Sequence, residues 1–246
     1  SKDAYDQNCG RSSLALRSPE KLIDDIQFIS RFSRAPIFIL HDLRQGGREY
    51  VKEFFSRLKK LNLKNEIVFE LFQYAGEEFF QMMNDSCAKY SIEITLETHD
   101  EKIRRYNSKF NCTNPKVIET LNFALKHGAK KIDLFFMTGI PSQTYQSAIE
   151  NIDFCEEIHL ACNKDPRLFY FVAPLAPFLD PASPAFENPE LHGFKKFCHT
   201  LEDHRKAILG GPFGVKPVTL TPTGTGAIRT LGRILPGVHP NGGGLA

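Results

Sequence analysis

Two His-Asp pairs stand just after apolar, strand-like runs of the sequence. His41 and Asp42 follow the run IFIL, and His99 and Asp100 come shortly after the run IEITL. Because the carboxyl ends of parallel strands carry the chemistry of βα folds, both pairs are candidate site residues. Imidazole and carboxylate groups suit zinc, iron or manganese, which indicates a metal-dependent hydrolase. Such a centre needs three or more protein ligands, and Asp42 and Asp100 equally suit the caps of following helices.

The strand-like residues 91–97 alternate strictly between polar and apolar side chains. A strand covered on both faces of a parallel sheet should instead be almost continuously apolar. We therefore expect Glu93, Thr95 and Glu97 to point into a barrel lumen, where carboxylates need a partner or a ligand. Glu70, in the preceding strand-like run, is a further carboxylate that would need a partner or a ligand there. The alternative is an edge strand whose carboxylates lie in water.

Four basic residues follow Glu97 closely in the sequence: Lys102, Arg104, Arg105 and Lys109. Charges at helical spacing are ordinarily solvated surface groups. The alternative is that one of the four pairs with a carboxylate of a bound ligand.

The segment 137–144 leaves a strand-like run and enters a helix-like one. Its backbone amides are placed to meet an anionic or polar ligand at the N-terminus of that helix. An ordinary βα turn needs the same glycine and proline, so the segment is compatible with either role.

Hydrophobic periodicity supplies the scaffold that would position these residues. Strand-like runs centred near residues 38, 69, 94, 135 and 170 alternate with segments of helical spacing. This alternation predicts an α/β fold with a parallel sheet or barrel. Five strands are fewer than the eight of a full barrel, so the barrel would be partial.

The C-terminal part of the chain has a different character. Pro189 begins a predicted helix that runs to about Ile208. Residues 210–246 hold ten of the 17 glycines and no Asp or Glu, which predicts a disordered or non-native tail. We therefore divide the chain into a βα barrel domain over residues 1–209 and a Gly/Pro-rich tail over residues 210–246.

Composition limits the classes of function. A chain of 246 residues that is 41% hydrophobic is long enough for one large domain. Its formal charge of +2 gives no electrostatic reason to bind nucleic acid or an anionic membrane. The longest apolar run, residues 168–175, is too short to span a bilayer, so we expect a cytoplasmic protein without a membrane partner. Its six cysteines include no CxxC pair, which argues against a disulfide scaffold or a zinc knuckle.

Five motifs in this order resemble the radical SAM core of cobalamin-binding-type radical SAM proteins, over about residues 1–207. They are ALRSPE at 15–20, LHD at 40–42, EITLETHDEKIR at 93–104, FFMTGIPSQT at 135–144 and APLAPFLDP at 173–181. The resemblance implies a partial parallel (β/α) barrel of the radical SAM type. It also implies an enzyme that reductively cleaves S-adenosylmethionine with a [4Fe–4S] cluster to start radical chemistry.

That family holds its cluster with three cysteines in a CxxxCxxC motif after the first strand, and the motif is missing here. Residues 1–5 resemble the stretch that follows the motif, so the chain is expected to be a fragment that lacks the first strand and the cluster loop. Without the cysteines it should not turn over. The resemblance further implies an electron donor such as a flavodoxin or ferredoxin, an unidentified small-molecule or peptide substrate, and cobalamin in an upstream domain.

The resemblance also assigns cofactor-binding positions at the strand ends. His41 and Asp42 match the strand end whose backbone meets the methionine amino group of S-adenosylmethionine. Glu97, with Glu93 near it, matches the polar position that contacts the ribose. The motif near the adenine is matched by Gly139, Ile140 and Pro141. The end of the last strand is matched by Ala173.

Two alternatives to a radical SAM enzyme are a metal-dependent barrel hydrolase that uses the two His-Asp pairs and a barrel without a cluster that serves as a binding scaffold. Stoichiometric zinc or manganese would favour the hydrolase. A natural N-terminus near Ser1 would favour the scaffold.

Overall fold

A computed structural model of the chain describes residues 15–107, 112–174, 184–192, 194–196, 198–209 and 220–222. Most of them belong to a parallel βα array. Its strands are β1 (Ile37–Ile39), β2 (Ile67–Leu71), β3 (Tyr90–Glu97), β4 (Ile132–Thr138) and β5 (Leu168–Pro174). Its helical segments are α2 (Pro19–Phe32), η1 (Leu43–Gly46), α3 (Arg48–Lys60), α4 (Glu77–Ser86), α5 (Glu101–Tyr106), α6 (Asn114–Lys126) and α7 (Tyr145–Ala161).

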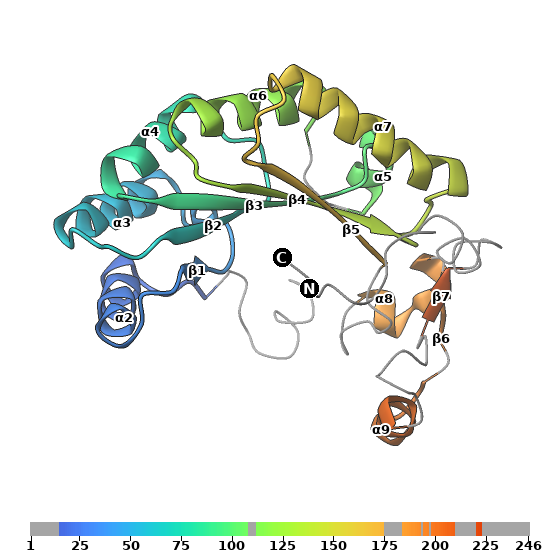
Figure 1. Ribbon diagram of the computed structural model, residues 1–246. Helices are drawn as coiled ribbons and strands as arrows, with labels where there is room; N and C mark the ends of the chain where they lie inside the picture. The colour runs from blue at the N-terminus through green and yellow to red at the C-terminus, as the bar shows by residue number, and fades with distance from the viewer. Residues whose placement is uncertain are drawn as a thin grey trace, which may run out of the picture.

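The sheet has the order β1-β2-β3-β4-β5, with every neighbouring pair parallel. Figure 1 shows it as an arch, with α4, α6 and α7 above its convex face. Strands joined in sequence order by right-handed crossovers place their helices on the same face, which produces this arrangement. The α/β fold with a partial parallel barrel is therefore confirmed.

The two faces of the sheet differ in polarity. Toward the helices the strands present buried apolar side chains, among them Phe69, Ile94 and Leu134, which belong to the main hydrophobic core. Along β3, Glu93 and Thr95 are less buried than their apolar neighbours, in the alternation expected for a lumen-facing set. Because β3 is the central strand, the alternative of an exposed edge strand is wrong.

The ends of the first helix follow from its local sequence. Ser18 Oγ accepts a hydrogen bond from the Lys21 N–H at 3.3 Å, and Pro19 occupies the first turn, where its missing N–H is not needed. Buried Ile23 and Ile26 lie on the inner side of the helix. Helix α6 begins in a similar way, with a proline in its first turn.

The predicted helix from Pro189 to Ile208 is wrong in its first part and is confirmed only from Leu201 onward. This stretch instead contains a 3₁₀ turn, η2 (Pro189–His192), and a short strand, β6 (Phe194–Lys196), before helix α9 (Leu201–Leu209). The helical periodicity was misleading because Phe194 belongs to a strand that pairs antiparallel with β7 (Leu220–Pro222). A short helix, α8 (Pro184–Glu187), precedes these elements. Apart from β7, the predicted tail lies outside the described residues and stays a prediction.

Among the helices of the described residues, none combines the length and the apolar character that crossing a bilayer requires.

Substituting one phenylalanine on each face of the sheet tests the assignment of the core. Phe69 is 1% exposed on the helix-covered face, whereas Phe38 of the neighbouring strand is 40% exposed. We expect Phe69→Ala to lower the free energy of unfolding by about 3–5 kcal/mol. Phe38→Ala should lower it by less than half as much, because much of its ring is already in water. Urea unfolding of both variants measures the difference, and equal losses would contradict the assignment.

Candidate functional site at the carboxyl ends of the strands

The carboxyl ends of the strands bring most predicted site residues to one edge of the sheet. His41 follows β1, Glu97 is the last residue of β3, and Gly139 follows β4 directly. Ala173 lies near the end of β5, exposed and in register with Met137 of β4. Glu93 lies deeper, in the middle of β3. Because all five strands are parallel, these ends form a single rim.

Three positions of this rim have left-handed backbone conformations. The φ angles are +70° at His41, +67° at Glu97 and +87° at Gly139. Glycine adopts this conformation freely, but in other residues it raises the conformational free energy by about 1–2 kcal/mol. Such residues concentrate at binding and catalytic sites, where the surrounding structure holds them in place.

His41 is exposed and joins the ends of β1 and β2. Its backbone N–H donates to Glu70 Oε2 at 2.8 Å, and its ring lies edge-on to Phe72 with centroids 5.9 Å apart. A cavity of about 340 Å³ beside β1 is lined in part by His41, Phe38 and Leu40. The strand end therefore offers an exposed imidazole next to a space of small-molecule size.

Asp42 has a structural role in this fold. Its carboxylate is 2% exposed and caps η1, accepting hydrogen bonds from the backbone N–H of Arg44 at 3.0 Å and of Phe72 at 3.0 Å. The Arg44 guanidinium also binds this carboxylate, and it donates to the carbonyls of Gln73 and Tyr74. Sequence reasoning missed Arg44, although a basic residue two positions after a capping Asp is a recognisable signal. The capping role considered for Asp42 is confirmed.

Glu97 is held in an unusual position at the end of β3. It is 5% exposed, and the register shifts between Thr95 and Glu97, so that they face the consecutive residues Phe135 and Phe136 of β4. Such bulges redirect a side chain at the rim of a barrel. The carboxylate is thus placed by a bulge and by a left-handed backbone together.

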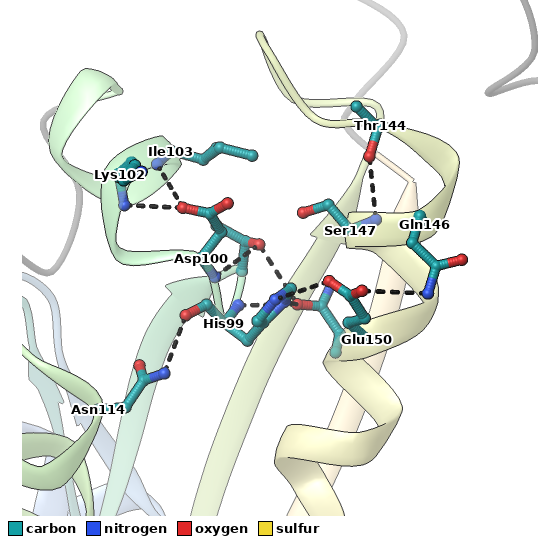
Figure 2. A network of polar contacts seen from close by, with 11 residues as sticks. His99, Asp100, Lys102, Ile103, Asn114, Thr144, Gln146, Ser147 and Glu150 are labelled. Carbon is teal, nitrogen blue, oxygen red and sulfur yellow. Dashed lines mark hydrogen bonds and ion pairs between the residues drawn. The ribbon is translucent and has the colours of Figure 1, made fainter.

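The residues after Glu97 are bound to helix α7. The Asn151 Oδ1 atom accepts a hydrogen bond from the His99 backbone N–H at 2.8 Å and lies 3.0 Å from His99 Nδ1. His99 Nε2 lies 3.3 Å from Glu150 Oε2 (Figure 2). Asp100 caps α5 by accepting from the N–H groups of Lys102 and Ile103. The capping role considered for Asp100 is therefore also confirmed.

The turn after β4 is closed by its own side chains. The Gly139 N–H donates to Gln143 Oε1 at 2.8 Å, and Gln143 Nε2 donates to the Met137 carbonyl at 3.0 Å. Ile140 is buried, and the Pro141 carbonyl accepts from Asn107 Nδ2 at 3.2 Å. The turn therefore has a fixed shape before any ligand binds.

A row of carboxylates crosses the middle of the sheet. Glu70, Glu93 and Asp133 are consecutive register partners on β2, β3 and β4. Lys131 Nζ lies 2.6 Å from Asp133 Oδ2. Burial raises the pKa of Glu93, and the neighbouring charges of Asp133 and Glu70 raise it further, against an opposing effect of Lys131.

Arg104 is the basic residue that departs most from the expected surface role. It is buried, whereas Lys102 and Arg105 are exposed, and Lys109 lies outside the described residues. The Arg104 Nη2 atom donates to the carbonyl of Cys112 at 3.1 Å and to the side chain of Asn114. Its Nε and Nη1 atoms are buried and have no hydrogen-bond partner in the part of the chain that the structure describes.

Nothing in the described part of the chain supports the metal-dependent hydrolase. No group of three or more His, Cys, Asp or Glu side chains in those residues is placed to hold a metal ion. Asp42 and Asp100, two of the four proposed ligands, are occupied as helix caps.

No family model and no curated protein sequence matches the chain. Among solved structures, it is similar to coproporphyrinogen III oxidase from Escherichia coli, described as a radical SAM enzyme. The TM-score is 0.52 at 13% identity, over 89% of this chain and 44% of the oxidase chain. This chain has the fold of the radical SAM partial barrel.

A second similar structure is HydG, described as a maturase of the [FeFe]-hydrogenase, with a TM-score of 0.45 at 11% identity. That match covers 67% of this chain and 37% of the HydG chain. The matches thus span less than half the length of either of these two proteins.

The cysteines present do not fit the cluster that the radical SAM barrel implies. A [4Fe–4S] cluster is held by several closely placed thiolates, and the sequence contains no CxxxCxxC motif. The described cysteines are dispersed, and burial raises the pKa of Cys87 and of Cys155 to about 12. Their thiols are therefore protonated at neutral pH.

The pair between Asp42 and Arg44 should matter more to stability than exposed ion pairs do. Asp42→Asn removes the charge that the largely buried Arg44 side chain faces, so we expect a loss of about 2 kcal/mol in the free energy of unfolding. The control is Glu53→Gln, which breaks the exposed pair with Arg57 and should cost less than about 0.5 kcal/mol. Urea unfolding compares them, and similar losses would refute the structural role of Asp42.

The raised pKa of Glu93 makes a pH-dependent prediction. Below the ordinary glutamate pKa of about 4.3, Glu93 is protonated in both the folded and the unfolded chain, so its raised pKa does not lower the stability there. As the pH rises toward and through the higher pKa of the folded state, the free energy of unfolding falls, because the unfolded chain ionises this carboxyl more readily than the native chain does. Glu93→Gln should therefore raise the melting temperature at pH 7 but not near pH 4.

The matched control for Glu93→Gln is the same change at the exposed Glu156 of α7. Glu156→Gln should leave the melting temperature nearly unchanged at both pH values. If Glu93→Gln stabilises the chain equally at pH 4 and pH 7, ionisation of Glu93 is not the cause.

Proposed function

We propose that this chain is the S-adenosylmethionine-binding partial barrel of a radical SAM enzyme. The observation that carries the proposal is the conformation of Glu97, a buried carboxylate on a bulged, left-handed strand end. A strained acidic residue at the rim of a βα barrel suits ligand binding better than fold stability. The likeness in fold to a radical SAM enzyme supports the same conclusion.

In this proposal each rim residue contacts a different part of S-adenosylmethionine. The Glu97 carboxylate accepts hydrogen bonds from the two ribose hydroxyls, since a carboxylate offers two acceptor oxygens and the hydroxyls are donors. The backbone around His41 and Asp42 meets the methionine amino group, and Glu93 adds negative charge deeper in the barrel. Adenine lies against the turn at 139–141, whose shape Gln143 fixes. Ala173 closes the far side of the site.

Binding and turnover are separate properties in this proposal. The cluster that supplies the electron for cleavage of S-adenosylmethionine needs cysteines that this sequence does not contain. The chain by itself should therefore bind the ligand weakly and leave it intact. Turnover, a substrate, an electron donor and any cobalamin would belong to a longer protein that supplies the cysteines.

Titration with S-adenosylmethionine tests the proposal. We expect the 246-residue chain to bind it at millimolar concentration, by ligand-observed NMR. Glu97→Gln should weaken binding about tenfold, because a charged acceptor of two hydrogen bonds is replaced by a neutral amide. Glu156→Gln, on the exposed side of α7, is the control and should bind as the unaltered chain does.

Two outcomes would contradict the proposal. If the unaltered chain does not bind S-adenosylmethionine, the assignment of the rim fails. If the chain alone releases methionine and 5′-deoxyadenosine under reducing conditions, the requirement for further cysteines fails. Sequencing the native gene upstream of Ser1 then decides whether codons for a CxxxCxxC motif precede this chain.

A further inference from the structure

We propose that Asn151 is a positioning residue that holds Glu97 in its binding conformation. Asn151 lies on α7, more than fifty positions from Glu97 in the sequence, and its side chain binds the two residues that follow Glu97. The inference rests on the proposed function, because it concerns how the ribose-contacting carboxylate is placed.

The Asn151 side chain oxygen is the centre of a buried set of hydrogen bonds. Asn151 is 0% exposed. Its Oδ1 accepts from the His99 N–H at 2.8 Å and from Thr98 Oγ1 at 3.3 Å, and it lies 3.0 Å from His99 Nδ1. Three donors from two consecutive residues therefore converge on one amide oxygen.

The orientation of this amide is fixed by chemistry. A backbone N–H can only donate, so the atom that faces the His99 N–H must be the oxygen of Asn151. The Nδ2 atom consequently points the other way, where it is buried and has no hydrogen-bond partner among the described residues. The hydrogen bonds of the Asn151 side chain are thus made by its oxygen, which contacts Thr98 and His99.

The neighbouring residue of α7 completes the contact. Glu150 Oε2 lies 3.3 Å from His99 Nε2, while Gln146 Nε2 donates to Glu150 Oε1 at 3.0 Å (Figure 2). Because the Asn151 oxygen can only accept, Nδ1 of His99 is the donor to it, and Nε2 on the other side of the ring faces the Glu150 carboxylate. Consecutive residues of one helix therefore hold both ring nitrogens of His99.

The segment is also held from a second helix. Asn114 Nδ2, in the first turn of α6, donates to the His99 carbonyl at 3.1 Å. Within the segment, the Asp100 N–H donates to Thr98 Oγ1 at 3.3 Å. Because the backbone after Glu97 is fixed at both its N–H and its carbonyl, Glu97 keeps a left-handed conformation that is otherwise unfavourable.

Helix α7 is a rigid support for this contact. Phe154, three positions after Asn151, is buried in the core, and its ring meets that of Phe136 edge to face with centroids 6.4 Å apart. Since Phe136 is the register partner of Glu97 on β4, the helix and the bulge are fixed to the same point of the sheet. Preorganisation of this kind improves binding by removing the cost of ordering the site.

The experiment combines variants of Asn151 with two measurements on the full 246-residue chain. Asn151→Leu keeps the approximate size and removes the acceptor, whereas Asn151→Asp keeps an oxygen toward the same three donors. Thr98→Val, which removes one donor with little change in shape, is a milder variant if Asn151→Leu does not fold. The measurements are S-adenosylmethionine binding by ligand-observed NMR and hydrogen exchange of the peptide that contains residues 97–100.

We expect Asn151→Leu to weaken S-adenosylmethionine binding about fivefold and to speed exchange in residues 97–100, whereas Asn151→Asp leaves both near the unaltered values. The decisive comparison is made in a Glu97→Gln background. If Asn151 acts through Glu97, Asn151→Leu should weaken binding there by less than twofold, because the group that it positions is already lost. A general loss of stability would weaken binding equally in both backgrounds.

The outcomes separate this inference from the proposed function. Binding that Glu97→Gln weakens but Asn151→Leu does not would overturn the inference and leave the function standing. Unchanged exchange in residues 97–100, or the same loss in both backgrounds, would also overturn it. If the unaltered chain does not bind S-adenosylmethionine, the proposed function and the positioning role fail together.

Discussion

Apolar packing between the convex face of the parallel sheet and its helices is the interaction on which the rest of this structure depends. Strands in sequence order, joined by right-handed crossovers, place their helices on one side. Phe69, Ile94 and Leu134 fill the layer between sheet and helices. The other face is thereby left for residues such as Glu93, whose raised pKa records the cost of placing a carboxylate there. The same parallel arrangement collects all strand ends at one rim.

At that rim, polar side chains take the place of neighbouring strands as hydrogen-bond partners of the backbone. Where a strand ends, the N–H groups that follow lose their ladder partners and need others. Asp42 accepts from the N–H of Phe72 after β2, Asn151 from that of His99 after β3, and Gln143 from that of Gly139 after β4. The rim is therefore shaped by polar side chains that are already bonded in the absence of a ligand.

Asp42, Gln143 and Glu97 are positioned in different ways at the rim. Asp42 and Gln143 are engaged with the backbone, so their contribution is the shape of the rim. Glu97 is the residue that a bulge and a left-handed backbone place at the end of the central strand. In the proposed function, the rim and the cluster cysteines are separate parts, and the sequence contains no CxxxCxxC motif. Ligand binding and radical chemistry are thus separable questions for this chain.

The sequence by itself determined the alternation of strands and helices, because hydrophobic periodicity reflects local burial. It also indicated that Glu93 faces away from the helices, since a two-residue period assigns the faces of a strand. It did not determine the structure after Pro189, where the strand β6 pairs with residues far along the chain.

Only the tertiary structure decided that Asp42 has a structural role at the rim. Asp42 looked like a site carboxylate, but its side chain binds Arg44 and accepts a hydrogen bond from the backbone N–H of Phe72, which follows a different strand. Asn151 carried no signal in the sequence, because its partners lie 52 and 53 positions away. Contacts over such separations depend on how helices pack on the sheet, which local sequence patterns do not encode.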